Sequence, residues 1–186
     1  MTKPNLYALR PMADADLERV LAWRNSERVR SCMFSDQLIP LEQHRAWWER
    51  AKTSPTSVHL IFEKEGVPMG VVNFTAIDRQ NGRCSWGFYV GPENTPRGTG
   101  TLMGLLAIDY AFGTLGMRKI CAEVIGFNTA SLGYHRKLGF LQEGRLARHV
   151  LRGNGYEDVV LFALFAEDWP EARQPLSQYL VQEEER

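Results

Sequence analysis

The stretch from Trp86 to Phe140 decides the fold, and its centre is the loop Pro96–Thr101, PRGTGT. An alternating apolar run at residues 86–90, WGFYV, precedes this loop and is typical of a strand. Apolar residues then recur every three or four positions from Leu102 to Leu115, which predicts an amphipathic helix closed by Gly116. Glycines before a helix leave backbone N–H groups exposed at the positive end of its dipole. The loop therefore predicts an anion site, most often for phosphate.

Two common nucleotide-binding loops do not fit this stretch. A Walker loop requires Lys followed by Ser or Thr after its last glycine, and the dinucleotide fingerprint requires glycine where Met103 stands. A second segment follows a strand-like run at Lys119–Ile125. Its sequence, NTASLGYHRKLGF, predicts a helix with Asn128 as the N-cap and Gly139 as the C′ residue.

Together the two segments resemble the Gcn5-related N-acetyltransferases. The pyrophosphate loop of that family reads Arg/Gln-x-x-Gly-x-Gly/Ala at a helix start; Arg97, Gly98 and Gly100 match it, and Leu102 replaces the usual last small residue. Asn128–Phe140 resembles the second motif of the family, with Asn-x-x-Ser, an aromatic pair and Lys-x-Gly-Phe. The resemblance implies an α+β fold with a central mixed, mostly antiparallel sheet, splayed at its fourth strand and flanked by helices. It also implies acetyl-CoA as co-substrate and no metal.

The composition indicates one soluble domain with a single core. The chain has 186 residues, 44% of them hydrophobic, and 22 basic residues balance 22 acidic ones, so no net field favours nucleic acid or a membrane. No apolar run approaches the roughly twenty residues of a membrane span. Three cysteines without metal or redox spacing suggest a cytoplasmic protein. We expect one N-acetyltransferase domain over residues 1–166, followed by a C-terminal helix and an acidic tail over residues 167–186.

The resemblance also implies which residues hold the cofactor. The pantetheine arm would run along the strand end as an added strand would, and a backbone N–H there would stabilise the acetyl oxyanion. The implied cofactor-binding residues are Tyr89, Val90, Arg97, Gly98, Thr99, Gly100, Thr101 and Asn128.

One position departs from the family pattern. A tyrosine seven residues after the motif asparagine commonly protonates the departing CoA thiolate, but His135 stands there in this chain. Tyr134 is its neighbour and points about 100° away by helix geometry. Three possibilities follow: His135 is the general acid, Tyr134 reaches the thiolate through a local distortion, or the thiolate leaves unaided. The last is chemically reasonable because a thiol pKa is about 8.5.

The acceptor side resembles one branch of the family, the sugar-nucleotide N-acetyltransferases of pseudaminic acid biosynthesis. These acetylate the 4-amino group of a UDP-linked 4-amino-4,6-dideoxy-N-acetyl-altrosamine. The resemblance rests on Trp-Arg-Asn, Met-Phe and His-x-x-Trp, and it implies a substrate site formed by Arg24, Asn25, Met33, Phe34, His44 and Trp47. Glu123 could orient or deprotonate the amine through a water, and His44 could also bind or deprotonate it.

Two rival functions remain open. The opening segment from Leu9 to Asn25 and the closing segment from Glu143 to Asp158 also resemble the ribosomal-protein N-terminal acetyltransferases, for which a peptide would be the acceptor. A third possibility is a module that binds acetyl-CoA without turnover, supported by the change from tyrosine to histidine. Exposed strand edges near the last hairpin make a homodimer possible.

Overall fold

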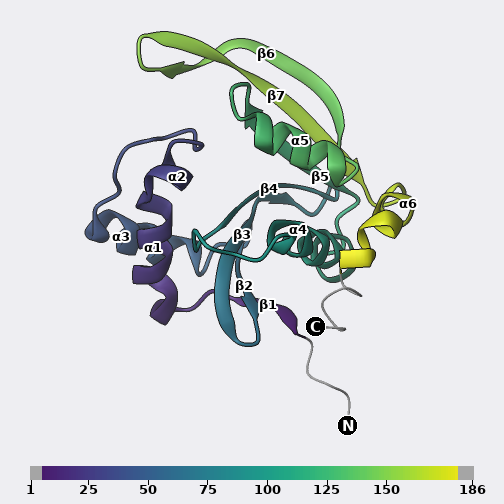
Figure 1. Ribbon diagram of the computed structural model, residues 1–186, viewed down its shortest axis with the longest axis horizontal. Coiled ribbons are helices and arrows are strands. Elements are labelled where there is room, and N and C mark those ends of the chain that lie inside the picture. The colour runs from purple at the N-terminus through teal and green to yellow at the C-terminus, as the bar shows by residue number, and fades with distance from the viewer. Residues whose placement is uncertain (1–5, 180–186) are drawn as a thin grey trace.

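The computed structural model describes residues 6–179 and contains a seven-stranded sheet in the order β1-β2-β3-β4-β5-β7-β6. Neighbouring strands are antiparallel except for the parallel pair β4 and β5. This mixed sheet has the α+β form expected from the sequence (Figure 1). The strands are β1 (Tyr7–Pro11), β2 (Val58–Lys64), β3 (Val67–Asp78), β4 (Arg83–Val90), β5 (Lys119–Ile125), β6 (Leu141–Arg152) and β7 (Gly155–Phe165).

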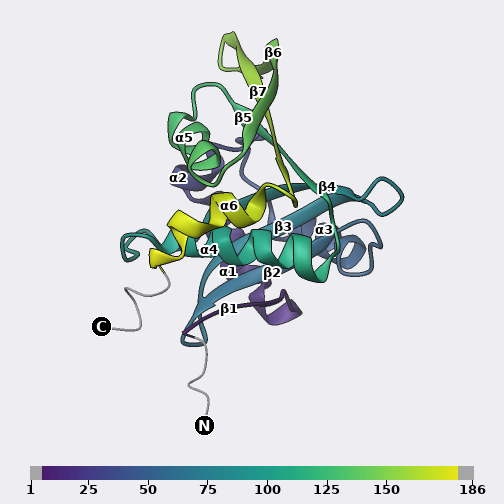
Figure 2. The ribbon, with the colours of Figure 1, turned by 90° about the vertical axis from the view of Figure 1, so that its right-hand side faces the viewer.

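Helices cover both faces of the first half of the sheet. Along β2, alternate residues enter different cores: Leu60 and Phe62 pack with the residues of α4, whereas Ile61 packs with Val20 of α1 and Trp48 of α3. Figure 2 shows α4 on the near face of these strands. The helices are α1 (Leu17–Asn25), α2 (Glu27–Arg30), α3 (Leu41–Ala51), α4 (Thr99–Asp109), α5 (Thr129–Lys137) and α6 (Trp169–Arg173), with short turns η1 (Asp14–Asp16), η2 (Tyr110–Thr114) and η3 (Gln174–Leu176).

The sheet opens between its two parallel strands. β4 pairs with β5 over Arg83–Ser85 and Lys119–Cys121, and beyond this point the strands diverge. β4 continues to pair with β3 as far as Val90, while β5 continues along β7. The end of β4 therefore has backbone groups with no neighbouring strand on the β5 side. This is the splay at the fourth strand that the sequence predicted.

Local sequence signals explain the helix boundaries beside this opening. Gly98 is the N-cap of α4 and has φ +98°, a left-handed conformation that glycine adopts without strain. α4 passes into a π-helical turn at η2 and ends before Gly116, as the periodicity predicted. Asn128 caps α5 by accepting a hydrogen bond from the Ser131 N–H at 3.1 Å, and Gly139 follows with φ +90°.

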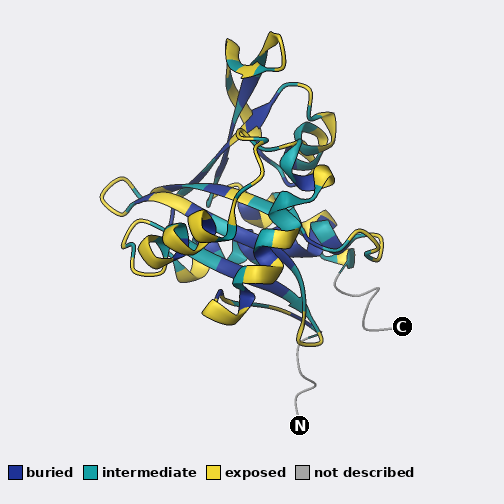
Figure 3. Cartoon of the chain, turned by 90° about the vertical axis from the view of Figure 1, so that its left-hand side faces the viewer, coloured by how far each residue is buried: buried dark blue, intermediate teal, exposed yellow. Residues whose placement is uncertain are grey.

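The last hairpin projects from the body of the molecule. β6 lies at the edge of the sheet and is largely exposed along its length, as the yellow of the projecting hairpin shows in Figure 3. α6 and η3 continue the chain as the expected C-terminal helix, and the acidic Glu183–Glu185 lies outside the described residues. No helix within residues 6–179 is long and apolar enough to cross a membrane.

Candidate active site

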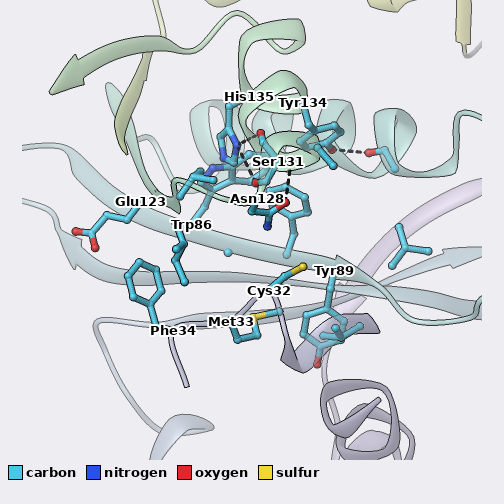
Figure 4. Close-up of a pocket in the computed structure, with 18 of the residues that line it drawn as sticks. Cys32, Met33, Phe34, Trp86, Tyr89, Glu123, Asn128, Ser131, Tyr134 and His135 are labelled. Atoms are coloured by element: carbon cyan, nitrogen blue, oxygen red, sulfur yellow. Dashed lines mark hydrogen bonds between the residues drawn. The ribbon is translucent and has the colours of Figure 1, made fainter. Parts of the chain in front are cut away.

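The opening between β4 and β5 is a cleft of about 640 Å³. One wall is formed by β4 and the segment after α2, and the other by β5 and α5, as Figure 4 shows. Gly100 and Met103 of α4 close one end. The cleft thus joins the glycine-rich loop to the second sequence motif. Nine of the residues proposed from the sequence line this cleft: Met33, Phe34, Tyr89, Val90, Gly100, Glu123, Asn128, Tyr134 and His135.

A second pocket of about 390 Å³ lies on the other side of β4, between α1, α3 and the sheet. Met33, Phe88 and Tyr89 line both pockets, so the two cavities meet along β4. In Figure 4 the Tyr89 hydroxyl points away from His135, toward the helices that form this second pocket. The second pocket contains Arg24, His44 and Trp47, which the sequence assigned to the acceptor.

The glycine-rich loop has the features of an anion site. The first turn of α4 contains no acidic side chain to offset the helix dipole. Two basic side chains lie there instead. Lys137 Nζ donates to Thr101 Oγ1 at 2.9 Å, and Arg97 is exposed in the preceding loop. Thr99 is buried and donates its hydroxyl to the Pro96 carbonyl at 2.7 Å, which fixes the loop. Positive charge at a positive helix end is stabilised by a bound anion.

Tyr134 is bound to the first turn of α4. Its hydroxyl donates to the Gly100 carbonyl at 2.5 Å, and burial raises the pKa of the phenol. A Cβ on Gly104 would overlap this hydroxyl, so glycine at that position makes room for the ring. Tyr134 lines the cleft, but its hydroxyl proton is used in the hydrogen bond to Gly100 of α4.

His135 is buried at 3% exposure among aromatic rings. Its ring stacks on Phe162 at 5.4 Å between centroids and lies edge-on to Trp86 at 5.6 Å and Phe140 at 5.1 Å. Nδ1 donates to the Ser131 carbonyl at 2.8 Å, and burial lowers the pKa of the imidazole. These surroundings favour a neutral ring, which is not the form that a general acid needs.

Glu123 and Phe34 lie at the same end of the cleft in Figure 4, and the Glu123 carboxylate points outward. Glu123 is an exposed residue of β5, and Phe34 is 47% exposed. Because Glu123 is exposed to solvent, a water can lie between its carboxylate and an amine in the cleft. Its role as base stays a prediction.

His44 and Trp47 form one wall of the second pocket. Their rings stack with centroids 5.1 Å apart and an interplanar angle of 22°. Burial lowers the pKa of His44, which also has a backbone hydrogen bond to Leu17. Its Nε2 is buried without a partner among the described residues, so a ligand in this pocket could satisfy it. Trp48, by contrast, belongs to the core and donates to Asp14 at 2.5 Å.

Arg24 and Asn25 have different surroundings, although they are adjacent. Arg24 Nη2 donates to the Ser35 carbonyl at 2.8 Å, while its Nη1 is buried with no partner within residues 6–179. The Asn25 amide donates to the Ile39 carbonyl and accepts from the Ile39 N–H, both at 2.9 Å. Asn25 lines neither of these two pockets, and its polar groups hold the loop before α3. Its role in substrate binding stays a prediction.

Two further residues shape the site, Arg28 and Cys32. Arg28 donates to the Val90 and Gly91 carbonyls at 2.8 and 2.7 Å, joining α2 to the end of β4. Cys32 also lines the cleft. Arg28 lies in the arginine-rich segment after α1, a usable signal, but its contact with β4 spans more than sixty positions and leaves no local pattern.

Comparisons with known proteins agree with this geometry. The family model "Acetyltransferase (GNAT) domain" matches residues 7–141. Spermidine N(1)-acetyltransferase of Escherichia coli (strain K12) is 24% identical over 165 residues, 89% of each chain. YdaF of Bacillus subtilis (strain 168), whose name places it provisionally among ribosomal N-acetyltransferases, is 28% identical over 66% of this chain and 67% of its own.

A solved structure has the same fold. The Vibrio cholerae spermidine N-acetyltransferase, in complex with CoA and spermine, superposes with a TM-score of 0.83 at 18% identity, over 90% of this chain and 99% of that one. No group of three or more His, Cys, Asp or Glu residues suited to a metal occurs within residues 6–179. These relatives support the superfamily that the motifs indicated, but none of them carries the name of the pseudaminic acid branch. The chain belongs to the acetyltransferase (GNAT) domain family and is an acetyl-CoA-dependent N-acetyltransferase.

Proposed function

We propose that the acceptor is a small amine that carries an anionic group, and specifically the 4-amino group of a UDP-linked 4-amino-4,6-dideoxy-N-acetyl-hexosamine. The observation that carries this proposal is the charge of the two pockets. The described residues that line them include three arginines, Arg24, Arg28 and Arg50, against one carboxylate, Glu123. A positive lining attracts a phosphate-bearing molecule and repels a polycation.

The shape of the second pocket supports the same proposal. Trp47 and His44 offer stacked flat surfaces, to which a ring of the acceptor can bind. The neutral His44 presents an unpaired Nε2 that can accept an N–H or O–H of that ligand. Because both pockets share Met33, Phe88 and Tyr89, an acceptor held there would reach the cleft beside β4.

Acetyl transfer then needs few protein groups. The amine nitrogen attacks the acetyl carbonyl of acetyl-CoA held in the cleft, and a backbone N–H at the end of β4 stabilises the oxyanion. Of the two candidates, Val90 fits better than Tyr89, because the register with β3 turns the Tyr89 N–H toward Val71. The amine proton passes through water to Glu123. The C–S bond breaks and CoA leaves as its thiolate. Since Tyr134 is bound to α4 and His135 is held neutral, we propose that no dedicated acid protonates this thiolate.

A polyamine is the second candidate, because the E. coli and V. cholerae relatives are spermidine acetyltransferases. Spermidine carries several positive charges, and a pocket suited to it would be lined by carboxylates. The arginines of the second pocket oppose that binding. A peptide N-terminus, suggested by YdaF, and an acetyl-CoA-binding module without turnover are the remaining alternatives.

Ligand-induced stabilisation tests the proposed acceptor class. In the presence of CoA, UDP should raise the Tm of the protein, because a ligand that binds only the folded state stabilises it in proportion to RT ln(1 + [L]/Kd). Spermidine at the same concentration should leave the Tm unchanged. A Tm raised by spermidine and not by UDP would contradict the proposal and favour a polyamine.

A further inference from the structure

Two arginines far apart in the sequence have unsatisfied guanidinium groups in one region of the molecule. Arg24 comes from α1 and Arg152 from the end of β6. Three of their nitrogens, Arg24 Nη1 and Arg152 Nε and Nη2, are buried and have no hydrogen-bond partner among the described residues. Buried charged donors without partners are unfavourable, so such groups in a native structure call for a ligand or another explanation.

Both arginines hold the same loop. Arg152 Nη1 pairs with Asp36 Oδ2 at 2.9 Å, and Arg24 Nη2 donates to the carbonyl of the adjacent Ser35 at 2.8 Å. The Arg152 side chain is only 12% exposed, and its guanidinium lies over the Phe127 ring, 5.8 Å from the centroid. The last hairpin and α1 thus meet at the segment that connects α2 to α3.

The charges in this region do not balance. Burial lowers the pKa of Arg24, and the positive charge of Arg152 lowers it further, against an opposing effect of Tyr89. Arg30 contacts the same segment through the Asp36 carbonyl but is already paired with Glu27. Of the two guanidinium groups, Arg152 has a carboxylate partner in Asp36 and Arg24 has only the Ser35 carbonyl, which leaves one net positive charge and three unpaired nitrogens. Planar arginine donors of this kind match the oxygens of phosphate.

We propose that Arg24 and Arg152 form a subsite for the diphosphate of the acceptor, and that Asp36 is the partner of Arg152 that this anion replaces on binding. This inference rests on the proposed function, because it assigns the phosphate of the sugar nucleotide to particular residues. Arg24 lines the second pocket, so an anion bound to it lies on the acceptor side of β4. Arg152 lines neither pocket and belongs to the subsite through residues 35 and 36, where it meets Arg24. The phosphates of CoA have a separate site at the loop before α4.

The test uses UDP binding and steady-state kinetics with Arg152→Gln and Arg24→Gln. Each variant should weaken UDP binding at least tenfold and raise the KM for the UDP-amino sugar at least as much, with the KM for acetyl-CoA unchanged. Arg79→Gln is the matched control, since Arg79 is exposed at the end of β3 and lines neither pocket. Unchanged UDP binding in both site variants would overturn the proposal.

Asp36→Asn separates phosphate binding from a purely structural ion pair. If Arg152 serves the ligand, this variant keeps the guanidinium, removes a competing carboxylate, and binds UDP as well as or better than the wild type. If the ion pair only positions the loop, Asp36→Asn and Arg152→Gln weaken UDP binding equally, which would overturn the proposal.

The proposed function and this subsite can fail separately. UDP binding that depends on Arg152, in a protein that acetylates no sugar nucleotide, would support the subsite and refute the function. Acetylation of the sugar nucleotide with an unchanged KM in both arginine variants would support the function and overturn the subsite. If the arginine variants raise the KM for acetyl-CoA and leave the acceptor KM unchanged, the arginines bind CoA, and the proposed subsite is wrong.

Discussion

Tyr134 and His135 are neighbours on α5, yet their surroundings give them different chemistry. The step of about 100° between neighbouring helix residues directs Tyr134 to the first turn of α4 and His135 to the aromatic rings between β4 and β7. The sequence identified both as candidates for the general acid. It could not distinguish them, because the state of each proton depends on Gly100 and Ser131, the carbonyls to which these side chains donate.

The buried His135 should make stability depend on pH. Burial lowers its pKa in the folded protein, so below the ordinary histidine pKa of about 6.5 the unfolded chain binds a proton that the folded chain does not. The free energy of unfolding should therefore fall between pH 7.5 and 5, by at most about 1.4 kcal/mol per pH unit for this one proton. Urea denaturation across this range measures the slope.

His135→Phe supplies the comparison, because it fills the aromatic site without a titratable group. Its stability should fall less steeply with acid than that of the wild type. Equal slopes in both proteins would show that His135 is not held neutral in the folded state. His149, on the projecting hairpin and exposed, provides a control: His149→Phe should retain the wild-type slope.

Tyr134→Phe tests whether an acid is needed. The variant loses one hydrogen bond, to Gly100, which should lower the free energy of unfolding by about 1 kcal/mol. If the thiolate leaves unaided, kcat should change less than about threefold. A loss of about 10² or more, the size expected for general acid catalysis, would identify Tyr134 as the acid. Single-turnover acetyl transfer under saturating acetyl-CoA measures this step.

At the scale of elements, the loop before α4 and the capped helix α5 were predictable from the sequence. Their signals are local: glycines, an asparagine cap and apolar periodicity. Gly98, Asn128 and Gly139 occupy the positions expected of them. The hydrogen bonds of Asn25 to the backbone of Ile39, fourteen positions away, could not be predicted in this way, because they depend on the fold.

Gly100→Val tests the loop as a phosphate site. A Cβ added at Gly100 would have its nearest neighbours at 3.8 Å in Val90 and 4.0 Å in Tyr134, so the fold can accept a side chain there. The added methyl groups would, however, lie where the pyrophosphate approaches the backbone. We expect the KM for acetyl-CoA to rise at least tenfold with an unchanged circular dichroism spectrum. Gly133→Val, at an exposed position of α5 with no atom within 4 Å, should retain the wild-type KM. Equal KM values in the two variants would contradict a role for Gly100 in cofactor binding.

At the scale of the molecule, the active site is an assembly of distant segments. Most of the cofactor cleft comes from residues 85–135, with a further contribution from residues 28–34, whereas the second pocket combines α1, α3, β3 and β4. The motifs predicted the first because it is nearly continuous in the chain. They did not predict the contact of Asp36 with Arg152, which joins the loop after α2 to the last hairpin across 116 positions. Burial and charge at that contact arise only from the tertiary fold.

The separation of the two pockets has a kinetic consequence. His44 lies in the second pocket and not in the cofactor cleft, so His44→Ala should raise the acceptor KM about tenfold and leave the KM for acetyl-CoA within twofold. His59→Ala serves as a control, because His59 packs against Trp47 and Trp48 but lines neither pocket. An effect on the acetyl-CoA KM alone would place His44 on the cofactor side.

The most direct measurement is CoA-thiol release by the purified protein with acetyl-CoA and four acceptors in parallel. These are a UDP-4-amino-4,6-dideoxy-N-acetyl-hexosamine, the same amino sugar without its nucleotide, spermidine, and a set of ribosomal-protein N-terminal peptides. The account predicts the highest kcat/KM with the UDP-linked sugar, and a loss of at least tenfold when the nucleotide is removed. Turnover of spermidine at a higher kcat/KM than the UDP-linked sugar would contradict it.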